Sequence, residues 1–315
     1  MKKYLIIGGA GFIGSHLSKA LLAKGNKVAV IDIAAKSVDA GAVHYLVDVQ
    51  HAKSVAAVFK KEKPDFVFHL AGAINLRREI TDPLFIKDMD FLLRAKIILD
   101  ACKKYNVKKI IFISSGGSVY ENAKEVPTPE EYLAHPASLY GLANLMIEKY
   151  IDLYCKSNGI NFTIPRVSNA YGPRQWQSGL IPASISKMSC GIKPVLFGNG
   201  GQTRDFIYID DVVDALILLA QKGPGRKATE DPRQSRDKNE VYNVASGKEI
   251  DLKKIIELIG QSLGADIKPE YKNSKNAGTE KSALDIKKIQ KELGWSPKTD
   301  IKTGILKVIE WYKKI

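Results

Sequence analysis

Hydrophobic and polar positions alternate in blocks along the first half of the chain. Short apolar runs such as Tyr4–Ile7 are typical of strands that are buried on both faces of a parallel sheet. The predicted strands are Tyr4–Ile7, Lys27–Ile31, His44–Leu46, Phe66–His69 and Lys109–Ile113, and the predicted helices are a segment ending near Lys24, Ser54–Lys61 and Phe91–Tyr105. This order predicts an α/β fold, a doubly wound parallel sheet of the Rossmann type with right-handed crossovers.

The alternation becomes less regular after about residue 175. Residues from Gly223 to Asn239 are rich in Gly, Pro, Arg and Asp, which favours a mobile surface loop. The predicted elements are strands at Val195–Phe197, Phe206–Ile209 and Tyr242–Val244, with helices at Val212–Gln221 and Leu252–Leu263. We therefore expect a Rossmann domain over residues 1–175, with later contributions near 205–245, and a smaller C-terminal α/β substrate-binding lobe over residues 176–315.

The composition is that of a globular protein with a basic surface. Of the 315 residues, 45% are hydrophobic and 26% are charged, and the net charge is +14. The lysines are spread in pairs without a run of five basic residues, so solvated helix faces account for most of the excess charge. Attraction of a diphosphate ligand is the second interpretation, and no nucleic-acid partner is expected.

Cysteines and apolar segments indicate the compartment. Cys102, Cys155 and Cys190 are odd in number and lack a C-x-x-C pair, which argues against a disulfide framework and a structural zinc site. The apolar stretch after Lys3 is too short for a signal peptide, and no stretch approaches the roughly eighteen apolar residues of a membrane span. We therefore expect a cytoplasmic protein without a metal or a membrane partner.

A glycine-rich turn joins the first predicted strand to the first predicted helix. Gly8, Gly11 and Gly14 allow a tight turn, close approach of backbone N–H groups to a diphosphate, and close helix–strand packing. Asp32 follows eighteen residues after Gly14, where a carboxylate accepts hydrogen bonds from a ribose 2′-hydroxyl and repels a 2′-phosphate. The pattern predicts NAD as the cofactor, and the nearby Lys36 keeps NADP as an alternative.

The glycine spacing and several later segments form one ordered pattern. The later segments are Asp48-Val49, His69–Gly72, Ser114–Tyr120, Tyr140, Arg166–Gln175, Val195–Gly198, Gln202–Phe206, Tyr242–Val244 and Leu293–Pro297. With them the chain resembles, over essentially its whole length, the extended short-chain dehydrogenase/reductases, and within these the NAD-dependent sugar-nucleotide epimerases and dehydratases. The resemblance implies an NAD site in the Rossmann domain and a nucleotide-sugar site, with a UDP-hexose as the first candidate, mainly in the C-terminal lobe.

The resemblance also assigns residues to both sites and a partner to the chain. The residues implied for NAD are Gly8, Gly11, Phe12, Ile13, Gly14, Asp32, Ile33, Asp48, Val49, Leu70, Ala71, Gly72, Ser114, Tyr140, Asn144 and Val167. The residues implied for the nucleotide sugar are Ala73, Asn75, Ser118, Tyr140, Asn169, Leu180, Val195, Phe197, Gln202, Arg204 and Asn276. The helices Phe91–Tyr105 and Tyr140–Ser157 are implied to pair in a homodimer. The apolar residues available for that interface, or equally for the monomer core, are Leu142, Leu145, Met146 and Ile147.

The resemblance makes Tyr140 the catalytic base, with a serine hydroxyl holding the substrate oxygen, Ser118 in preference to Ser115. The family places a lysine four residues after the tyrosine, and this chain has Asn144 there. Asparagine bonds a ribose hydroxyl but supplies no positive charge, and losing a nearby cation raises a tyrosine pKa by roughly one to three units. Activity near neutral pH would then fall by roughly tenfold to a thousandfold unless another group compensates.

Other positions also depart from the family pattern. Gly116 stands where a catalytic serine or threonine is usual, and Asn276 stands where a second phosphate-binding arginine is usual. The candidate replacements for that charge are Lys272, Lys275 and Lys281. Asp90 and Leu93-Arg94 stand where the family carries Asn and Gly-Thr on a helix beside the active site, which places a bulky, charged residue there.

These residues predict an NAD-dependent 4-epimerase that oxidises the sugar transiently to a 4-keto form. One alternative is a catalytically impaired or binding-only member, which Asn144, Gly116 and Asn276 favour. Another is a different NAD-dependent sugar-nucleotide enzyme, a reductase, dehydratase or decarboxylase. The segment Gly116-Gly117-Ser118 lacks the acidic residues that the family's dehydratases and decarboxylases carry, which counts against these two activities. An asparagine introduced deliberately to trap a complex would give the same sequence.

Overall fold

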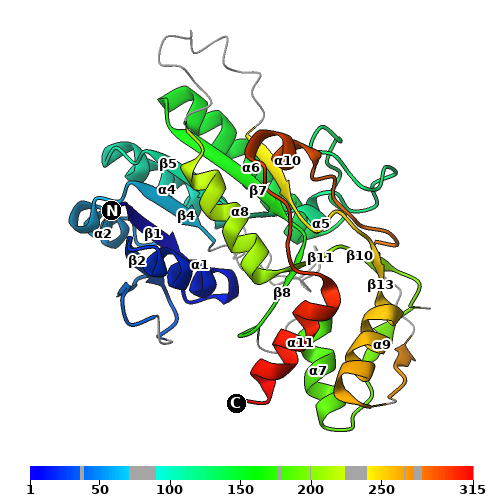
Figure 1. Cartoon of the computed structure of the whole chain (residues 1–315). Helices are drawn as coiled ribbons and strands as arrows, with labels where there is room; N and C mark the ends of the chain where they lie inside the picture. Colours follow the sequence, from blue (N-terminus) through cyan, green and yellow to red (C-terminus); the bar gives the residue numbers. More distant parts are fainter. Residues whose placement is uncertain are drawn as a thin grey trace. The chain divides into compact units, whose positions relative to one another are not determined.

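The computed structural model describes residues 1–35, 39–70, 90–175, 179–198, 200–223, 240–265, 267–272 and 279–314. The chain forms two compact units whose segments alternate along the sequence (Figure 1). The first unit comprises Met1–Val119, Pro136–Arg166 and Val213–Tyr242, and the second comprises Tyr120–His135, Val167–Val212 and Asn243–Ile315. This division differs from the predicted boundary at residue 175, because residues 120–135 and 167–175 belong to the second unit.

The main sheet belongs largely to the first unit. Its strands run in the order β12-β7-β5-β4-β1-β2-β3, and β6 pairs with β7. Their bounds are β1 Lys3–Ile7, β2 Lys27–Asp32, β3 Val43–Leu46, β4 Phe66–His69, β5 Lys109–Phe112, β6 Ser114–Ser115, β7 Asn161–Val167 and β12 Val241–Val244. The strand β1 lies parallel to both β2 and β4, with Ile7 opposite Ile31 and His69. The predicted doubly wound parallel sheet is therefore confirmed.

Helices lie on both faces of this sheet (Figure 1). The helices of the first unit are α1 Phe12–Ala23, α2 Ala52–Glu62, α4 Phe91–Lys104, α5 Gly116–Val119, α6 Leu139–Asn158 and most of α8 Ile209–Gln221. Of these, α2, α4 and α6 lie on one face and α1 and α8 on the other. Apolar residues of α2, α4 and α6 form one core with alternate strand residues such as Ile7, Val67 and Phe112. Residues between these in the strands point to the other face, where the rings of Tyr4 and Phe66 stack with centroids 5.2 Å apart. Because β1, β2, β4 and β5 run parallel, their carboxyl ends lie at the same edge of the sheet.

The second unit contains shorter elements. Its helices are α7 Leu180–Ser189, α9 Leu252–Leu263, α10 Lys287–Leu293 and α11 Ile301–Tyr312. Its strand pairs are β8 Asn169–Tyr171 with β11 Phe206–Tyr208, β9 Val195–Phe197 with β14 Glu270–Lys272, and β10 Thr203–Arg204 with β13 Ile250–Asp251. The helix α9 packs against α7 and α11. The predicted loop from Gly223 to Asn239 lies outside the described residues after its first position.

Candidate active site

The glycine-rich turn lies between β1 and α1. Gly8 has a φ of 84°, a conformation in which a side chain is strained. A Cβ atom on Gly14 would lie 2.5 Å from the Gly8 carbonyl oxygen, so helix and turn approach at a distance that only glycine permits. Gly11 caps α1 without a side-chain acceptor, which leaves the first N–H groups of the helix available to an anion. The turn therefore fits the diphosphate of a dinucleotide.

Asp32, the residue predicted to bind the ribose, ends β2 beside this turn. Its Oδ2 atom accepts a hydrogen bond from the Ala10 N–H over 3.0 Å, and its Oδ1 atom accepts one from the Ala34 N–H over 2.9 Å. Two backbone donors thus fix the carboxylate next to the glycines. Each oxygen keeps a lone pair for a ribose hydroxyl.

The other residues implied for the cofactor lie along the same edge or outside the described part of the chain. Ile33 is 73% exposed, and Val49 is buried. The Asp48 carboxylate accepts from the Gln50 N–H over 2.9 Å. The Leu70 N–H donates to the Ile7 carbonyl over 2.9 Å, which extends the edge past β4. The predicted residues Ala71 and Gly72, and the alternative Lys36, lie outside the described residues.

The predicted base, Tyr140, lies in the first turn of α6 and is half-buried. The Ser138 hydroxyl caps this helix by accepting a hydrogen bond from the Gly141 N–H over 3.1 Å. The hydroxyl oxygens of Ser115 and Ser118 lie 3.2 Å apart, and Ser115 hydrogen-bonds Tyr140. In the structure the Ser115 hydroxyl donates to the Ser118 hydroxyl. Because a hydroxyl carries one proton, donation from Ser115 to Tyr140 requires Ser118 to donate to Ser115 instead. The structure thus brings the predicted base and both candidate serines together.

Gly141 explains how closely these elements approach. A Cβ atom at this position would lie 2.1 Å from the Ser118 carbonyl oxygen. No other residue fits between α6 and the end of α5 without displacing the backbone that carries both candidate serines. A glycine directly after Tyr140 is therefore a requirement of the site's geometry.

Asn144 lies one helical turn after Tyr140 and is 7% exposed. Its Nδ2 atom donates to the Tyr140 carbonyl oxygen over 2.9 Å. Burial raises the pKa of Tyr140, and the hydrogen bonds with Asn144 and Ser115 oppose that rise. Both opposing groups are neutral, so the phenol is a weaker acid than an ordinary tyrosine. A tyrosine with a raised pKa is a poor base near neutral pH.

A buried ionic group lies behind these residues. The Glu148 carboxylate, on α6, accepts a hydrogen bond from the Ser114 hydroxyl over 2.5 Å. Arg166, on β7, donates through Nε over 3.0 and 3.2 Å and through Nη2 over 2.6 Å. Both charged side chains are at most 6% exposed. Sequence reasoning did not find this group, and the Ser114 hydroxyl that it assigned to the cofactor binds Glu148.

Comparison with known proteins decides the family. Residues 4–245 match the sequence model of the NAD dependent epimerase/dehydratase family. The chain belongs to this family. Membership confirms the predicted resemblance and the predicted cofactor, NAD, for which the glycine turn and Asp32 offer a fitting cradle.

Relatives within the epimerase/dehydratase family cover the chain almost completely. The crystal structure of UDP-glucose 4-epimerase with UDP-glucose from Thermotoga maritima is 32% identical, covers 99% of both chains and has a TM-score of 0.89. UDP-N-acetylglucosamine 4-epimerase from Methanobrevibacter ruminantium, in complex with UDP-N-acetylmuramic acid, is 28% identical over 99% of this chain and 98% of its own, with a TM-score of 0.87. UDP-glucose 4-epimerase from Mycolicibacterium smegmatis is 28% identical over 98% of both chains.

One of the positions that depart from the family pattern, Arg94, lies near a buried histidine. His69, at the end of β4, is 1% exposed, and its ring nitrogens find no hydrogen-bond partner among the residues that the structure describes. Burial and, to a lesser extent, the charge of Arg94 lower the pKa of His69 to about 4. The Asp90 carboxylate accepts from the Gln50 amide over 3.3 Å. Arg94 thus places a charge close to the carboxyl end of β4.

The residues implied for the nucleotide sugar lie mostly in the second unit. The Arg204 Nη1 atom donates to the carbonyls of Thr203 and Thr279, each over 2.7 Å. Burial lowers the pKa of Arg204, and the charge of Glu121 opposes this. Asn169 begins β8, Leu180 begins α7, Val195 and Phe197 bound β9, and Gln202 is buried. Ala73, Asn75 and Asn276 lie outside the described residues.

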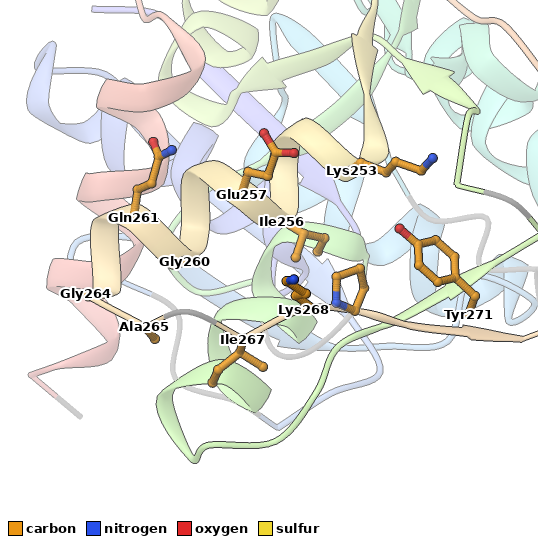
Figure 2. Close-up of a pocket in the computed structure, with 11 residues that line it drawn as sticks. Lys253, Ile256, Glu257, Gly260, Gln261, Gly264, Ala265, Ile267, Lys268 and Tyr271 are labelled. Carbon is orange, nitrogen blue, oxygen red and sulfur yellow. The ribbon is translucent and has the colours of Figure 1, made fainter.

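A cavity of about 590 Å³ opens in the second unit between α9 and residues 267–271. Ile256 and Ile267 contribute apolar walls, and Lys253 lies near Tyr271 at one end (Figure 2). None of the predicted site residues lines it. Over the described ranges no cluster of acidic, histidine or cysteine side chains is arranged to hold a metal ion. The same part of the chain contains no helix long and apolar enough to span a membrane.

Proposed function

We propose that this protein is an NAD-dependent 4-epimerase of a UDP-hexose. One observation carries the proposal: Tyr140 is hydrogen-bonded to Ser115, with Ser118 3.2 Å from Ser115, in the unit that contains the glycine turn. A phenol beside hydroxyl groups is the equipment needed to remove a proton from a sugar hydroxyl. The epimerases among the relatives support the choice of reaction and of a UDP-sugar.

The proposed mechanism assigns one role to each of a few groups. When bound, NAD would supply the hydride acceptor for oxidation at C4 and the hydride donor for reduction, and inversion would require that the 4-keto sugar present its opposite face for the return. Tyr140 accepts the proton of the sugar hydroxyl and gives it back, while Ser118 or Ser115 donates a hydrogen bond to the sugar oxygen. Asp32 binds the ribose, and the N-terminus of α1 binds the diphosphate. Asn144 bonds a ribose hydroxyl in place of the usual lysine.

Nucleotide recognition is assigned to the second unit. We expect Leu180, Val195 and Phe197 to contact the base. Phe197, at the end of β9, is 52% exposed and so has surface available for this contact. Arg204 is proposed to bind the phosphate or ribose with the nitrogens that its two carbonyl contacts do not use. Gln202 and Asn169 complete the proposed set, with Val167 at the nicotinamide.

The proposed assembly is a homodimer through α4 and α6. Leu93, Leu142 and Leu153 on these helices are 50%, 42% and 67% exposed, whereas Ile147 is buried in the monomer core. An interface of standard size would cover such residues. Sedimentation velocity should give a dimer, and Leu142→Glu combined with Leu153→Glu should shift it toward a monomer.

A binding-only member is the second candidate, and a specific observation favours it. Tyr140 has a raised pKa, and only neutral groups oppose the rise. Such a protein would bind NAD and a UDP-hexose without measurable inversion. Calorimetric binding combined with an absence of turnover would select this alternative.

The deciding experiment compares the unmodified protein with Asn144→Lys. Both are incubated with NAD and a panel of UDP-hexoses, and inversion at C4 is followed by NMR between pH 6 and 10. We expect Asn144→Lys to raise the rate at pH 7.5 by roughly tenfold to a thousandfold, because a cation lowers the tyrosine pKa by roughly one to three units. Tyr140→Phe is the control and should abolish inversion in both backgrounds. Inversion that persists in Tyr140→Phe, or a failure of all variants to bind NAD, would overturn the proposal.

A further inference from the structure

The buried ion pair of Glu148 and Arg166 lies behind the Ser115–Tyr140 contact without being part of it. We propose that this pair, acting through Ser114, is a positioning element that holds the Ser115 hydroxyl at Tyr140. The proposal concerns the site of the proposed function and rests on that function only for its rate measurements.

The first step concerns one face of α6. Tyr140, Asn144 and Glu148 are spaced four residues apart, so their side chains follow one another along the same side of the helix. The Asn144 amide already binds Tyr140. Glu148 therefore occupies the next position along the face that carries the reactive phenol.

The second step concerns the two residues of β6. Ser114 binds Glu148 over 2.5 Å, and the adjacent Ser115 hydrogen-bonds Tyr140. Two neighbouring serines thus attach one short strand to two points of α6 that are eight residues apart. Loss of the Ser114–Glu148 hydrogen bond would leave one of these two attachments between β6 and α6. The position of Ser115 relative to Tyr140 would then be less well fixed.

The third step concerns Arg166. It comes from β7, which pairs with β6, and its guanidinium binds both oxygens of Glu148. An isolated carboxylate at 3% exposure is costly, and the arginine fork offsets that cost while fixing the direction of the carboxylate. A buried ion pair seldom stabilises a fold more than apolar residues of the same volume would. In this protein the ion pair fixes the direction in which Glu148 presents an oxygen to the Ser114 hydroxyl.

The fourth step concerns the consequence for Tyr140. Hydrogen bonding with Ser115 is one of two contributions that lower its pKa against the effect of burial. Because Asn144 brings no charge, the phenol depends on these neutral contacts more than it would beside a lysine. A change at Ser114, which has no contact with the phenol in this arrangement, is therefore expected to be measurable at Tyr140.

The test is a double-mutant cycle with the variants Ser114→Ala, Ser115→Ala and the double variant. The pKa of Tyr140 is read from the ¹³Cζ chemical shift of labelled tyrosine, assigned with Tyr140→Phe, in the protein with NAD bound. We expect each single variant to raise that pKa by roughly half a unit to one unit, the size of one net hydrogen bond. The double variant should match Ser115→Ala, because Ser114 acts through Ser115. For Ser114→Ala, rates below the pKa should fall by roughly threefold to tenfold, with KM for the UDP-hexose unchanged.

Lys109→Met is the matched control. Lys109 is also buried, lies at the opposite end of β5, and donates to the Leu219 carbonyl over 2.7 Å. Its loss should lower the unfolding midpoint and leave the Tyr140 pKa unchanged. A Ser114→Ala variant that leaves the pKa unchanged, or whose effect adds to that of Ser115→Ala, overturns the proposal. If the pKa responds as expected while no variant inverts a UDP-hexose, the positioning role stands and the proposed function fails.

Discussion

Two buried carboxylates, one in each unit, accept hydrogen bonds from several donors and are stabilised differently. Glu148 in the first unit, 3% exposed, binds a cation and a hydroxyl, both from side chains. Asp205 in the second unit is 2% exposed, and its donors among the described residues are all neutral. They are the N–H groups of Ser246 (2.8 Å), Gly247 (3.0 Å) and Leu284 (3.3 Å) and the hydroxyls of Ser246 (2.7 Å) and Ser168 (3.2 Å).

The difference lies in what each carboxylate organises. Burial raises the pKa of Asp205, and the hydrogen bonds from Ser246, Leu284 and Gly247 oppose the rise. Backbone N–H groups donate to Asp205, so Asp205 fixes how three distant segments of the second unit meet. Side chains donate to Glu148, so Glu148 fixes the directions of particular side-chain groups. The first kind of centre supports a fold, and the second kind suits a reactive site.

The largest effect is expected for Asp205→Asn. The new amide group must face N–H and O–H donors, so the variant loses acceptor atoms where five donors converge. We expect a loss of about 4 kcal/mol in the free energy of unfolding, measured by urea denaturation. Ser246→Ala, which removes one hydroxyl and keeps the backbone donor, should cost only about 1 kcal/mol. A loss below 1 kcal/mol for Asp205→Asn would show that this centre is not what unites the segments.

The next largest effect is expected for His69, whose buried ring nitrogens have no hydrogen-bond partner in the described part of the chain. The pKa of His69 is lowered to about 4 by burial and then by Arg94, whereas a histidine in an unfolded chain titrates near 6.5. Between these values the unfolded chain binds the extra proton, so the stabilisation is complete above pH 6.5 and is lost as pH falls toward 4. The expected loss is about 3 kcal/mol, and His69→Leu should remove that slope from a series of urea curves. The exposed His51 is the control, because His51→Gln should leave the slope in place.

The smallest change in stability is expected when both members of the ion pair are replaced. Glu148→Met with Arg166→Met fills a similar volume, so the free energy of unfolding should stay within about 1 kcal/mol of the original. The Tyr140 pKa should nevertheless rise, because Ser114 has lost its acceptor. A double variant that keeps both its stability and its Tyr140 pKa would remove the contrast between the two carboxylates.

Most of the sheet could be predicted because its strands are continuous apolar runs. The strand β7 was missed, and Pro165 within Asn161–Val167 is the reason, since proline removes a donor from a ladder. The structure accommodates it because the pairing of β7 with β5 extends only to Thr163. On the other side Ile164 donates to the Glu240 carbonyl over 2.9 Å. The two- and three-residue strands of the second unit depend on tertiary pairing and carry no periodic signal of their own.

The candidate site, like the sheet, was predictable from the sequence only in part. Tyr140 and the serines could be named because the short segments that contain them resemble those of the family, and the glycine turn has a fixed spacing. Glu148 is 34 residues from Ser114 and 18 from Arg166, so no local pattern joins them. A signal was present in retrospect: Arg166 is the second-last residue of a strand whose residues are otherwise mostly apolar, and a buried arginine requires a carboxylate.

The alternation of segments between the two units has a consequence for recombination. Neither unit is encoded by one continuous stretch, since residues 120–135, 167–212 and 243–315 together make the second. A single crossover with a related gene at any of these junctions therefore divides at least one unit between two parents; a crossover after residue 242, for example, exchanges residues 243–315 but leaves the other two segments of the second unit unchanged. Transplanting the specificity of a relative would require exchanging three separate segments, and a functional hybrid from one exchange should be rare in a shuffled library.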